Sequence, residues 1–434
     1  MTHITIKNVG PIKDVSFDLN KINVFMGPQS SGKSTIAKIV SYCSWFEKNK
    51  ILHISDQTNF FEELIAFHNL EDTYFSDDSE ILYKSDNCRL DFKWKWKEDD
   101  KNTVDIHLYE GNVFKNRKIS YIPAERNFVT LQGLGKYNET RDNILNFMYD
   151  WFLAKKELNK NNSYSMPLPG LGEVSFYYDK ENDIDKIVLE SDRNIKLNHA
   201  SSGLRSCIPL IIVFNYIVTN IHNSKRTKTP FEIIDFEEKI QYLSTESPEM
   251  TEEIKENMIT LKSKIDDMAI ILERLQNPEE LSGALTKIQE QVANILGYYS
   301  DYFYSQVIIE EPELNLFPKT QQELIYYMLE VLNKDEKDHQ LILTTHSPFI
   351  LFAINNCMMG GLVGKIIPKE EAETLPSHNS WIDPSKVSIY EIHNGEINRI
   401  QDEDGIIKDN YLNQAYKENS NEYLSMLNYY EDEE

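Results

Sequence analysis

The stretch NVFMGPQSSGKSTIAKIV, residues 23–40, constrains the fold more than any other part of the chain. Residues 22–26 form an apolar run that predicts a buried strand, and residues 33–48 predict a helix. The loop between them carries Gly27 and Gly32 five positions apart, followed by Lys33 and Ser34, which matches the pattern GxxxxGK[ST]. A strand, a glycine loop and a helix in this order are typical of α/β folds.

The composition of this loop indicates a phosphate cradle. Glycine lets the backbone turn without a Cβ clash, so several N–H groups can converge on phosphate oxygens. The start of the following helix adds the positive end of its dipole. Lys33 can reach the β- and γ-phosphates, and the Ser34 hydroxyl can bind Mg²⁺. We expect the cradle to consist of Gly27, Pro28, Gln29, Ser30, Ser31, Gly32, Lys33 and Ser34.

A second motif, VIIEEPELN, begins at Val307. Residues 306–309 predict a short apolar strand that ends in two adjacent carboxylates, Glu310 and Glu311. Side chains alternate in direction along a strand, so the two carboxylates can serve different purposes. One can hold a hydrated Mg²⁺, and the other can orient an attacking water.

Two further motifs complete the set. In QLILTTHSPFIL, residues 340–344 predict a strand, and His346 follows it at a position from which it can hydrogen-bond a γ-phosphate. In HASSGLRSCIPLIIVF, the turn Ser201-Ser202-Gly203 opens an apolar helix expected over residues 203–221. The N–H groups of that turn make a second anion cradle. The cradle at residues 201–203 would serve a different nucleotide from the cradle at residues 27–34, because the loop at Lys33 already surrounds one nucleotide.

The order of these four motifs resembles that of ABC-type ATPases, and most closely their soluble branch, which includes the RecF/SMC proteins and the overcoming-lysogenization-defect (OLD) ATPases. The resemblance covers residues 1–50, 119–127, 196–221 and 300–360. It implies a Walker A site that includes Lys33, Ser34 and Thr35, a Walker B metal ligand in Glu310, a catalytic base in Glu311 and a switch histidine in His346.

The same resemblance implies an oligomer. Ser201, Ser202 and Gly203 would form the signature that contacts the ATP of a second protomer. The expected assembly is therefore a homodimer or a larger homo-oligomer with two composite ATP sites. The segment YIPAERN, residues 121–127, resembles a family segment at the interface of the two lobes. No residue of this chain is assigned to the glutamine loop.

The chain departs from the family pattern at several positions. Gln29 replaces the usual asparagine of the P-loop, and Leu204 replaces the glutamine that ends the signature. The acidic residue of the D-loop is missing, and Asn315 and Phe317 stand where related soluble ATPases often have histidines. These departures are compatible with slow or tightly coupled hydrolysis.

The expected fold class is α/β: a P-loop ABC-type ATPase head with a mixed sheet core, an N-terminal antiparallel β lobe and an inserted helical hairpin. Residues 3–9 and 14–19 predict two strands joined at Gly10-Pro11, residues 145–158 a helix, and residues 172–190 a β-hairpin. The expected domains are residues 1–222 and 300–360 for the two parts of the head, 223–299 for the insertion, and 361–434 for a C-terminal β/α extension with an acidic tail.

The insertion carries a heptad-like apolar stripe at residues 247–296, interrupted at Asn277-Pro278. This pattern predicts two antiparallel helices. They can project as an arm or pack on the head, and the pattern does not distinguish the two arrangements. Within the C-terminal extension, the stretch VSIYEIHNGEINRIQDEDG, from residue 387, predicts a second β-hairpin.

The formal net charge of −25 argues against a broad, non-specific grip on nucleic acid, which depends on many lysine and arginine contacts to phosphates. The stretch FKWKWK, residues 92–97, predicts an exposed edge strand. Because aromatics and lysines alternate in it, a local nucleic-acid surface is the alternative interpretation.

The cysteines, the apolar runs and the first residues of the sequence favour a cytoplasmic protein. The four cysteines, Cys43, Cys88, Cys207 and Cys357, lie far apart and form no zinc-ligand set, so we expect reduced, packed thiols. The longest apolar run, residues 208–221, is too short to span a bilayer. The first residues lack the layout of a signal peptide. We therefore expect a cytoplasmic protein without a membrane partner.

Several functions are compatible with these motifs. The first is a stand-alone regulatory ATPase, as found in bacterial anti-phage defence, that binds ATP and Mg²⁺ and controls a separately encoded effector, for which a nuclease is one candidate. OLD-like relatives often carry a C-terminal Toprim nuclease, and fewer than 90 residues follow His346 here. The alternatives are a RecF/SMC-like ATPase of DNA repair or DNA tethering, the nucleotide-binding subunit of an ABC transporter, and a non-hydrolysing scaffold.

Overall fold

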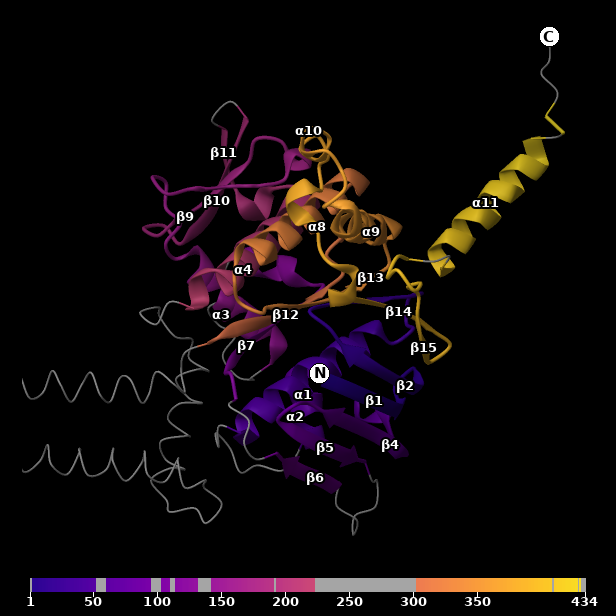
Figure 1. Ribbon diagram of the computed structural model, residues 1–434. Helices are drawn as coiled ribbons and strands as arrows, with labels where there is room; N and C mark the ends of the chain where they lie inside the picture. Colours follow the sequence, from indigo (N-terminus) through magenta and orange to yellow (C-terminus); the bar gives the residue numbers. More distant parts are fainter. Residues whose placement is uncertain are drawn as a thin grey trace, which may run out of the picture.

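The computed structural model describes residues 2–51, 60–94, 103–109, 114–131, 142–190, 193–222, 302–407, 410–427 and 429–430. These residues form three sheets with helices packed against them (Figure 1). The heptad-like stripe at residues 247–296 lies outside the described residues, as does the whole expected insertion 223–299. The predicted helical hairpin therefore stays a prediction.

A six-stranded sheet forms the centre of the molecule, with the strand order β15-β14-β3-β13-β12-β7. Five of its strands are parallel, and β15 is antiparallel to β14 at one edge. The predicted mixed sheet is confirmed. Its strands are β3 (Ile22–Met26), β7 (Arg117–Ile122), β12 (Tyr304–Glu310), β13 (Gln340–Thr345), β14 (Val387–His393) and β15 (Glu396–Arg399).

The central position of β3 explains its uninterrupted apolar sequence. All five of its residues are buried, as expected of a parallel strand covered on both faces. Val24 and Met26 belong to the hydrophobic core on one face, and Phe25 belongs to the core on the other. One face packs against α1 (Lys33–Ile51). The helices on the other face are α3 (Asn143–Lys155), α4 (Ser202–Val218), α8 (Pro318–Lys334) and α9 (Pro348–Val363).

The N-terminal β lobe is an antiparallel sheet with the order β2-β1-β4-β5-β6, as predicted. Its first two strands pair from Thr2↔Leu19 to Val9↔Ile12, so the turn lies at Gly10-Pro11. The sheet packs with α1 and α2 (Phe60–His68) around an apolar core. Its strands are β1 (Thr2–Val9), β2 (Ile12–Leu19), β4 (Phe75–Lys84), β5 (Cys88–Lys93) and β6 (Thr103–Leu108).

The predicted edge strand at residues 92–97 is wrong in its described part. β5 ends at Lys93 and lies between β4 and β6, so it is not an edge. Phe92 and Trp94 are buried in the core of the lobe, and residues 95–97 lie outside the described residues. These two aromatic rings are therefore not available for stacking on nucleic-acid bases.

A third sheet, with the order β11-β10-β9-β8, lies beside α3 and α4 (Figure 1). The hairpin predicted at residues 172–190 is confirmed, because β9 and β10 pair in antiparallel from Ile184↔Asp179 to Val188↔Ser175. The strands are β8 (Tyr164–Ser165), β9 (Ser175–Asp179), β10 (Ile184–Leu189) and β11 (Arg193–Lys196).

The predicted buried helix after Gly203 is confirmed as α4. With the short helical turn after it, the helical stretch runs from Ser202 to His222 and is longer than the apolar run of residues 208–221. Among the described residues it is the one helix long and apolar enough to cross a membrane, and 72% of its most apolar window is buried inside the protein. It fills the core against the sheet, as the central helix of a globular domain does.

The hairpin predicted from residue 387 is confirmed as β14 and β15. Its two-residue turn consists of Asn394 and Gly395, both with positive φ, which is the preferred chemistry for such a turn. β14 pairs in parallel with β3 from Val387↔Ile22 to Glu391↔Met26. Residues assigned by sequence to the C-terminal extension thus supply two strands to the sheet of the head.

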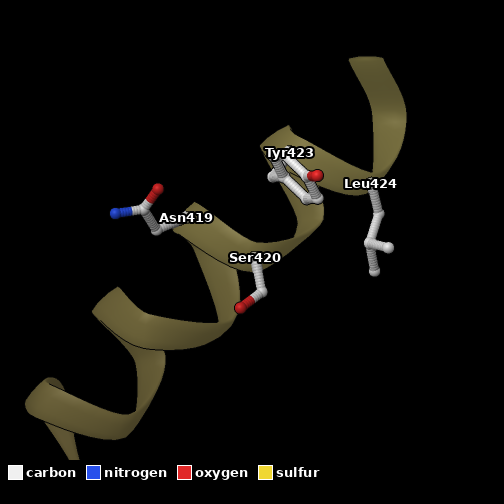
Figure 2. Close-up of a pocket in the computed structure, with 4 residues that line it drawn as sticks. All are labelled: Asn419, Ser420, Tyr423 and Leu424. Atoms are coloured by element: carbon white, nitrogen blue, oxygen red, sulfur yellow. The ribbon is translucent and has the colours of Figure 1, made fainter. Parts of the chain in front are cut away.

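After α10 (Lys369–Ala372) and the β14–β15 hairpin, the last described helix is α11 (Tyr411–Leu427), which extends away from the rest of the molecule (Figure 1). The Asn410 side chain caps its first turn by accepting hydrogen bonds from two backbone N–H groups. A shallow hollow on this helix is lined by Asn419, Ser420, Tyr423 and Leu424 (Figure 2).

All four cysteines lie among the described residues, and all are free and buried. Burial raises the pKa of Cys207 and of Cys357 to about 12. Such thiols stay protonated at neutral pH and are poor nucleophiles. The expectation of reduced, packed cysteines is confirmed.

Candidate nucleotide-binding site

The glycine loop lies between the end of β3 and the first residue of α1, as the motif predicts. Gly27, Ser30 and Gly32 all have positive φ, at 149°, 58° and 106°. A Cβ on Gly27 would lie 2.2 Å from the carbonyl oxygen of Ile392 in β14, and a Cβ on Gly32 would lie 2.3 Å from Ile12. The two glycines are therefore needed for close packing as well as for backbone conformation.

Lys33 is buried at the centre of this loop. Its Nζ donates hydrogen bonds to the carbonyl oxygens of Gly27 (3.0 Å) and Pro28 (2.6 Å). Desolvation lowers the pKa of Lys33 to about 8, and the negative charges of Glu311 and Glu313 oppose this shift. The ammonium group is thus held by exchangeable carbonyl contacts that phosphate oxygens can replace.

Ser34 and Thr35 follow Lys33 in the first turn of α1. Ser34 is partly exposed, whereas Thr35 is buried. The partly exposed Ser34 hydroxyl would therefore be available as a ligand of a metal ion.

The two adjacent carboxylates stand at the end of β12, as predicted, and their environments differ. Glu310 is 5% exposed, and its Oε1 has no hydrogen-bond partner among the described residues. A buried carboxylate oxygen without a partner is unfavourable. Carboxylate oxygens are preferred ligands of Mg²⁺, which usually keeps several of its waters. Glu310, together with the Ser34 hydroxyl, therefore fits a hydrated magnesium ion.

Glu311 turns away from the strand direction. Its φ is 43°, in the left-handed region, and its backbone N–H donates to the carbonyl of Thr344 (3.0 Å). A non-glycine residue in this conformation costs on the order of 1 kcal/mol or more, and such strain is concentrated at functional sites. The conformation brings the Glu311 side chain to the end of the neighbouring strand β13.

His346 follows β13, and its Nε2 lies 3.0 Å from Oε1 of Glu311. This hydrogen bond is the largest cause of the lowered pKa of Glu311, and the charges of His346, Lys33 and Arg126 add to it. Glu311 is therefore ionised at neutral pH, and in this contact the His346 Nε2–H is the donor. The predicted base and the predicted switch histidine thus contact each other directly.

Glu313 is a site residue that the sequence analysis did not single out. Its Oε1 accepts hydrogen bonds from the Thr345 hydroxyl (2.8 Å) and from the backbone N–H of His346 (2.7 Å). Burial raises the pKa of its carboxyl group. Glu313 therefore fixes the backbone from which His346 projects. The available signal was the third acidic residue of the EEPE motif.

Arg126 is a second site residue without a predicted role, although it lies in the segment 121–127 that resembles a family motif. It is fully buried. Its guanidinium donates to the carbonyl oxygens of Glu310 (2.8 Å) and Glu311 (2.9 Å), and its Nε donates to that of Ser206 in α4 (3.2 Å). Burial lowers its pKa to about 10, which leaves it charged at neutral pH. Arg126 joins the end of β12 to the first turns of α4.

The signature turn, Ser201–Gly203, packs against the loop that follows Glu311. Ser201 caps α4 by accepting from the N–H of Leu204, and Ser201 and Ser202 are exposed. A Cβ on Gly203 would lie 2.9 Å from the carbonyl oxygen of Asn315. Nearby, Phe317 is 75% exposed at the start of α8. The structure thus brings Lys33, Glu310, Glu311 and His346 to one edge of the sheet and places Ser201–Gly203 on the adjoining surface.

Comparison with known proteins identifies the family of the chain. The family model "AAA domain" matches residues 3–299, and the model "AAA ATPase domain" matches residues 304–351. No curated protein matches the chain in a comparison of sequences.

Solved structures of similar shape include an SMC head domain from Thermotoga maritima, with 10% identity, 92% of this chain and 98% of the other covered, and a TM-score of 0.36. An Smc head domain from Pyrococcus furiosus bound to the C-terminal domain of ScpA has 8% identity, 97% and 99% coverage, and a TM-score of 0.36. The recombination mediator RecF has 10% identity, 92% and 97% coverage, and a TM-score of 0.30. At these identities and scores the likeness says nothing about activity.

The first of the two family models spans more than half of the chain, and the glycine loop with its lysine has the geometry that such a domain requires. The chain therefore belongs to the AAA domain family of P-loop ATPases.

Proposed function

We propose that this protein binds Mg·ATP at residues 27–35 and hydrolyses it in an assembly of two copies. The observation that carries the proposal is the convergence of Lys33, Glu310, Glu311 and His346 at the carboxyl edge of three neighbouring parallel strands, β3, β13 and β12. In open α/β sheets, ligands bind outside the carboxyl ends of the strands.

In this proposal Lys33 gives up its contacts with the carbonyls of Gly27 and Pro28 and donates to the β- and γ-phosphates. The backbone N–H groups of the loop, with its positive φ at Gly27, Ser30 and Gly32, surround the phosphates. The Ser34 hydroxyl and Glu310 would hold the hydrated Mg²⁺. When bound, that ion would neutralise charge on the β- and γ-phosphate oxygens.

Glu311 is the proposed base. Its carboxylate is ionised, and the hydrogen bond from His346 occupies Oε1. Oε2 can therefore accept the proton of a water placed in line with the γ-phosphate. His346 keeps the carboxylate oriented, and Glu313 keeps His346 in place through its backbone N–H.

The second copy enters through the signature turn. Ser201 and Ser202 are exposed at the N-terminus of α4, a helix of 17 residues whose free N–H groups favour an anion. We propose that this turn contacts the γ-phosphate held by the other copy, so that each site is completed by two chains. The exposed Phe317, beside the same surface, would be covered in that assembly.

For the biological role, we propose a regulatory ATPase of bacterial anti-phage defence that controls a separately encoded effector, with a nuclease as the first candidate. The support is the order of the four motifs, which resembles that of soluble ATPases from such systems. A DNA-repair or DNA-tethering ATPase is the alternative. The net charge of −25 and the burial of Phe92 and Trp94 count against it.

The variant Glu311→Gln tests the catalytic proposal, with Glu336→Gln as a control that changes an exposed glutamate on the same part of the chain. With ATP and Mg²⁺, we expect Glu311→Gln to bind ATP, to lose at least about 100-fold in turnover, and to accumulate as a dimer or larger oligomer in light scattering. Turnover at the parent rate would refute the assignment of Glu311, and an ATP-bound monomer would refute the composite site.

The biological role needs a separate test. We expect affinity purification of Glu311→Gln with ATP to retain a partner protein that Lys33→Ala does not retain. Cells that carry the intact system should resist phage, and cells with Lys33→Ala should not. Equal resistance with Lys33→Ala would contradict the defence role.

A further inference from the structure

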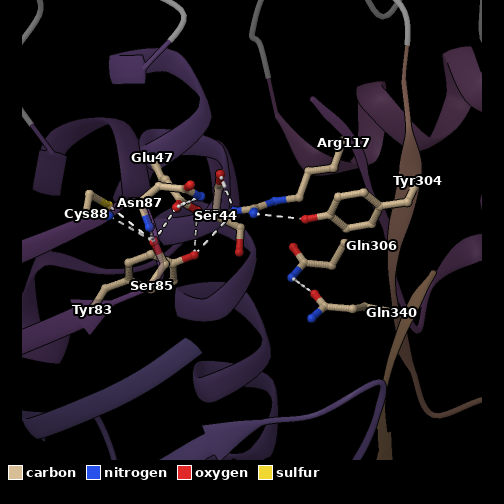
Figure 3. A network of polar contacts seen from close by, with 10 residues as sticks. All are labelled: Ser44, Glu47, Tyr83, Ser85, Asn87, Cys88, Arg117, Tyr304, Gln306 and Gln340. Atoms are coloured by element: carbon tan, nitrogen blue, oxygen red, sulfur yellow. Dashed lines mark hydrogen bonds and ion pairs between the residues drawn. The ribbon is translucent and has the colours of Figure 1, made fainter. Parts of the chain in front are cut away.

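A polar hollow of 630 Å³ lies at the opposite edge of the central sheet from the glycine loop. It is bounded by the first residues of β7, β12 and β13, by the residues that precede β3 and β14, and by the turn between β4 and β5. Figure 3 shows part of its wall, with Arg117, Tyr304 and Gln340 beside Ser85 and Asn87. None of these residues belongs to the candidate nucleotide site.

The hollow is lined by four cations, Lys21, Lys115, Arg117 and Lys386, and by two carboxylates, Asp86 and Asp338. Arg117 is balanced by the buried Glu47, so three lysines face two carboxylates, which is still a local excess of positive charge in a chain with a net charge of −25. The ion pair of Lys21 is a 4.0 Å contact with Asp338, whose side chain is 94% exposed. Such an exposed, long contact is weak, so Lys21 is free to bind an anion.

Arg117 is the buried element of this wall. Its side chain is 6% exposed, and it pairs with the fully buried Glu47 of α1. It also donates to the carbonyl of Ser44 (3.1 Å) and to the Tyr304 hydroxyl (3.3 Å). Its Nε–H has no acceptor among the described residues. The Nε atom is buried away from the hollow, so Arg117 contributes to this wall through its guanidinium charge and its contact with Tyr304.

The rest of the lining offers neutral hydrogen-bonding groups. Gln340 accepts a hydrogen bond from the side chain of Gln306 (3.0 Å), which orients its amide so that the NH₂ group is the free end. Asn20 and Asn87 contribute further carboxamides. Cavities of several hundred Å³ with a few charged groups are typical of small-molecule sites.

We propose that this hollow binds a small phosphate-bearing molecule. Lysine ammonium groups and an arginine guanidinium are the side chains that recognise phosphate, and the carboxamides can hold the remainder of the molecule. A long nucleic-acid backbone fits less well, because the cationic residues are confined to one compact hollow in an acidic protein.

The hollow also contacts two elements that carry residues of the proposed ATP site. The inference that a ligand there affects ATP turnover rests on the proposed function. Arg117 contacts Ser44 and Glu47 in α1, the helix that starts at Lys33. It also contacts Tyr304 in β12, the strand that ends at Glu310. A ligand at Arg117 therefore acts on the two elements that hold the Walker A lysine and the metal-binding carboxylate.

The test measures binding of inorganic pyrophosphate and of AMP to the full-length chain by calorimetry. The background variant Lys33→Ala removes binding at the glycine loop. In that background we compare Lys21→Glu/Lys386→Glu with Lys365→Glu/Lys369→Glu, a control that makes the same change of charge at exposed lysines outside the hollow. Arg117 is left intact, because its replacement would leave Glu47 buried without its partner.

We expect at least one of the two probes to bind to the Lys33→Ala chain. The affinity should fall at least tenfold in Lys21→Glu/Lys386→Glu and less than threefold in the control. No binding of either probe to Lys33→Ala would overturn the proposal, as would binding that survives the reversal at Lys21 and Lys386. Preferential binding of a 20-base-pair DNA duplex over both probes would replace the small molecule with nucleic acid.

The connection to ATP turnover has its own readout in the chain with an intact Lys33. Competition at the glycine loop affects the parent and Lys21→Glu/Lys386→Glu equally, so the difference between their responses to pyrophosphate reports on the hollow. We expect the responses to differ at least twofold. Identical responses would refute the connection, while the binding result would stand independently.

Discussion

Nε2 of His346 lies 3.0 Å from Oε1 of Glu311, and this contact joins the ends of two neighbouring parallel strands, β13 and β12. Both side chains are a little over one-quarter exposed, so the pair faces the site and is still shielded on its inner side. The contact fixes one carboxylate oxygen and leaves the other for water. It also makes the orientation of Glu311 depend on the position of β13.

The first prediction concerns this pair. In His346→Ala, Glu311 loses its fixed hydrogen bond, and we expect kcat for ATP hydrolysis to fall by about 10- to 100-fold. The dissociation constant for ATP, measured separately by calorimetry, should change less than threefold. His346→Gln, which keeps an N–H donor, should recover part of the rate. A loss of ATP affinity with unchanged kcat would show that His346 serves binding and does not orient Glu311.

The second prediction concerns the pH dependence of ATP binding. Without nucleotide, the pKa of Lys33 is lowered to about 8. Phosphates favour the charged form, so binding raises this pKa, and above pH 8 each ATP bound should take up a proton. The ATP affinity should then fall by up to tenfold per pH unit above pH 8. Calorimetry in buffers of different ionisation enthalpy measures the uptake directly, and zero uptake at pH 9 would contradict the prediction.

The same shift has a consequence for stability. The pKa of Lys33 in the folded chain lies below its usual value of 10.5, so between pH 8 and pH 10.5 the unfolded chain binds more protons at this position. The contribution of Lys33 to the free energy of unfolding therefore rises with pH across that window. Lys33→Met should remove this rise relative to the parent in urea titrations at pH 7.5 and 10.

The third prediction concerns Arg126. Lysine has one donor group, which cannot reach the carbonyls of Glu310, Glu311 and Ser206 together. We expect Arg126→Lys to lower the free energy of unfolding by about 3 kcal/mol, because buried acceptors lose their partners. Arg89→Lys, which changes an exposed arginine paired with Asp91, should cost less than about 1 kcal/mol. Equal urea midpoints for the two variants would refute a structural role of Arg126.

The fourth prediction concerns the packing behind the glycine loop. In Gly27→Ala the new Cβ would lie 2.2 Å from the carbonyl oxygen of Ile392, so either the loop or β14 must move. We expect the ATP affinity to fall at least tenfold and the melting temperature to fall as well. ATP binding equal to that of the parent would show that the loop tolerates displacement from β14.

The parts of the site that lie close together in sequence were predictable. The loop at residues 27–34 carries its own chemistry, because the glycines, the lysine and the serine act within one turn. The strand ends at Glu310 and at residue 345 were also predictable, since apolar runs precede them. Arg126 was not, because it binds backbone carbonyl oxygens about 80 and 185 residues away, and carbonyl oxygens have no sequence signature.

The errors have a similar origin. The alternation of aromatic and lysine residues at 92–97 correctly indicated a strand at its start, but such alternation does not show whether a second strand pairs with each edge. Residues 103–108 supply that neighbour as β6, and their sequence TVDIHL alternates polar and apolar residues, a strand signal that the sequence analysis leaves unused. Likewise the pattern from residue 387 predicted a hairpin but not its pairing with β3, which is a contact between opposite ends of the chain.

The pairing of β3 with β13 and β14 determines when the central sheet can form during synthesis on the ribosome. β3 is complete at residue 26, whereas β14 begins at residue 387. At roughly 5 to 20 residues per second, about 20 to 70 seconds separate the emergence of the two strands. The strands of the N-terminal β lobe are all made within the first 108 residues and can pair early. β3 cannot pair until β13 and β14 have been synthesised. Premature termination anywhere before residue 387 therefore leaves one edge of β3 without a hydrogen-bonded neighbour.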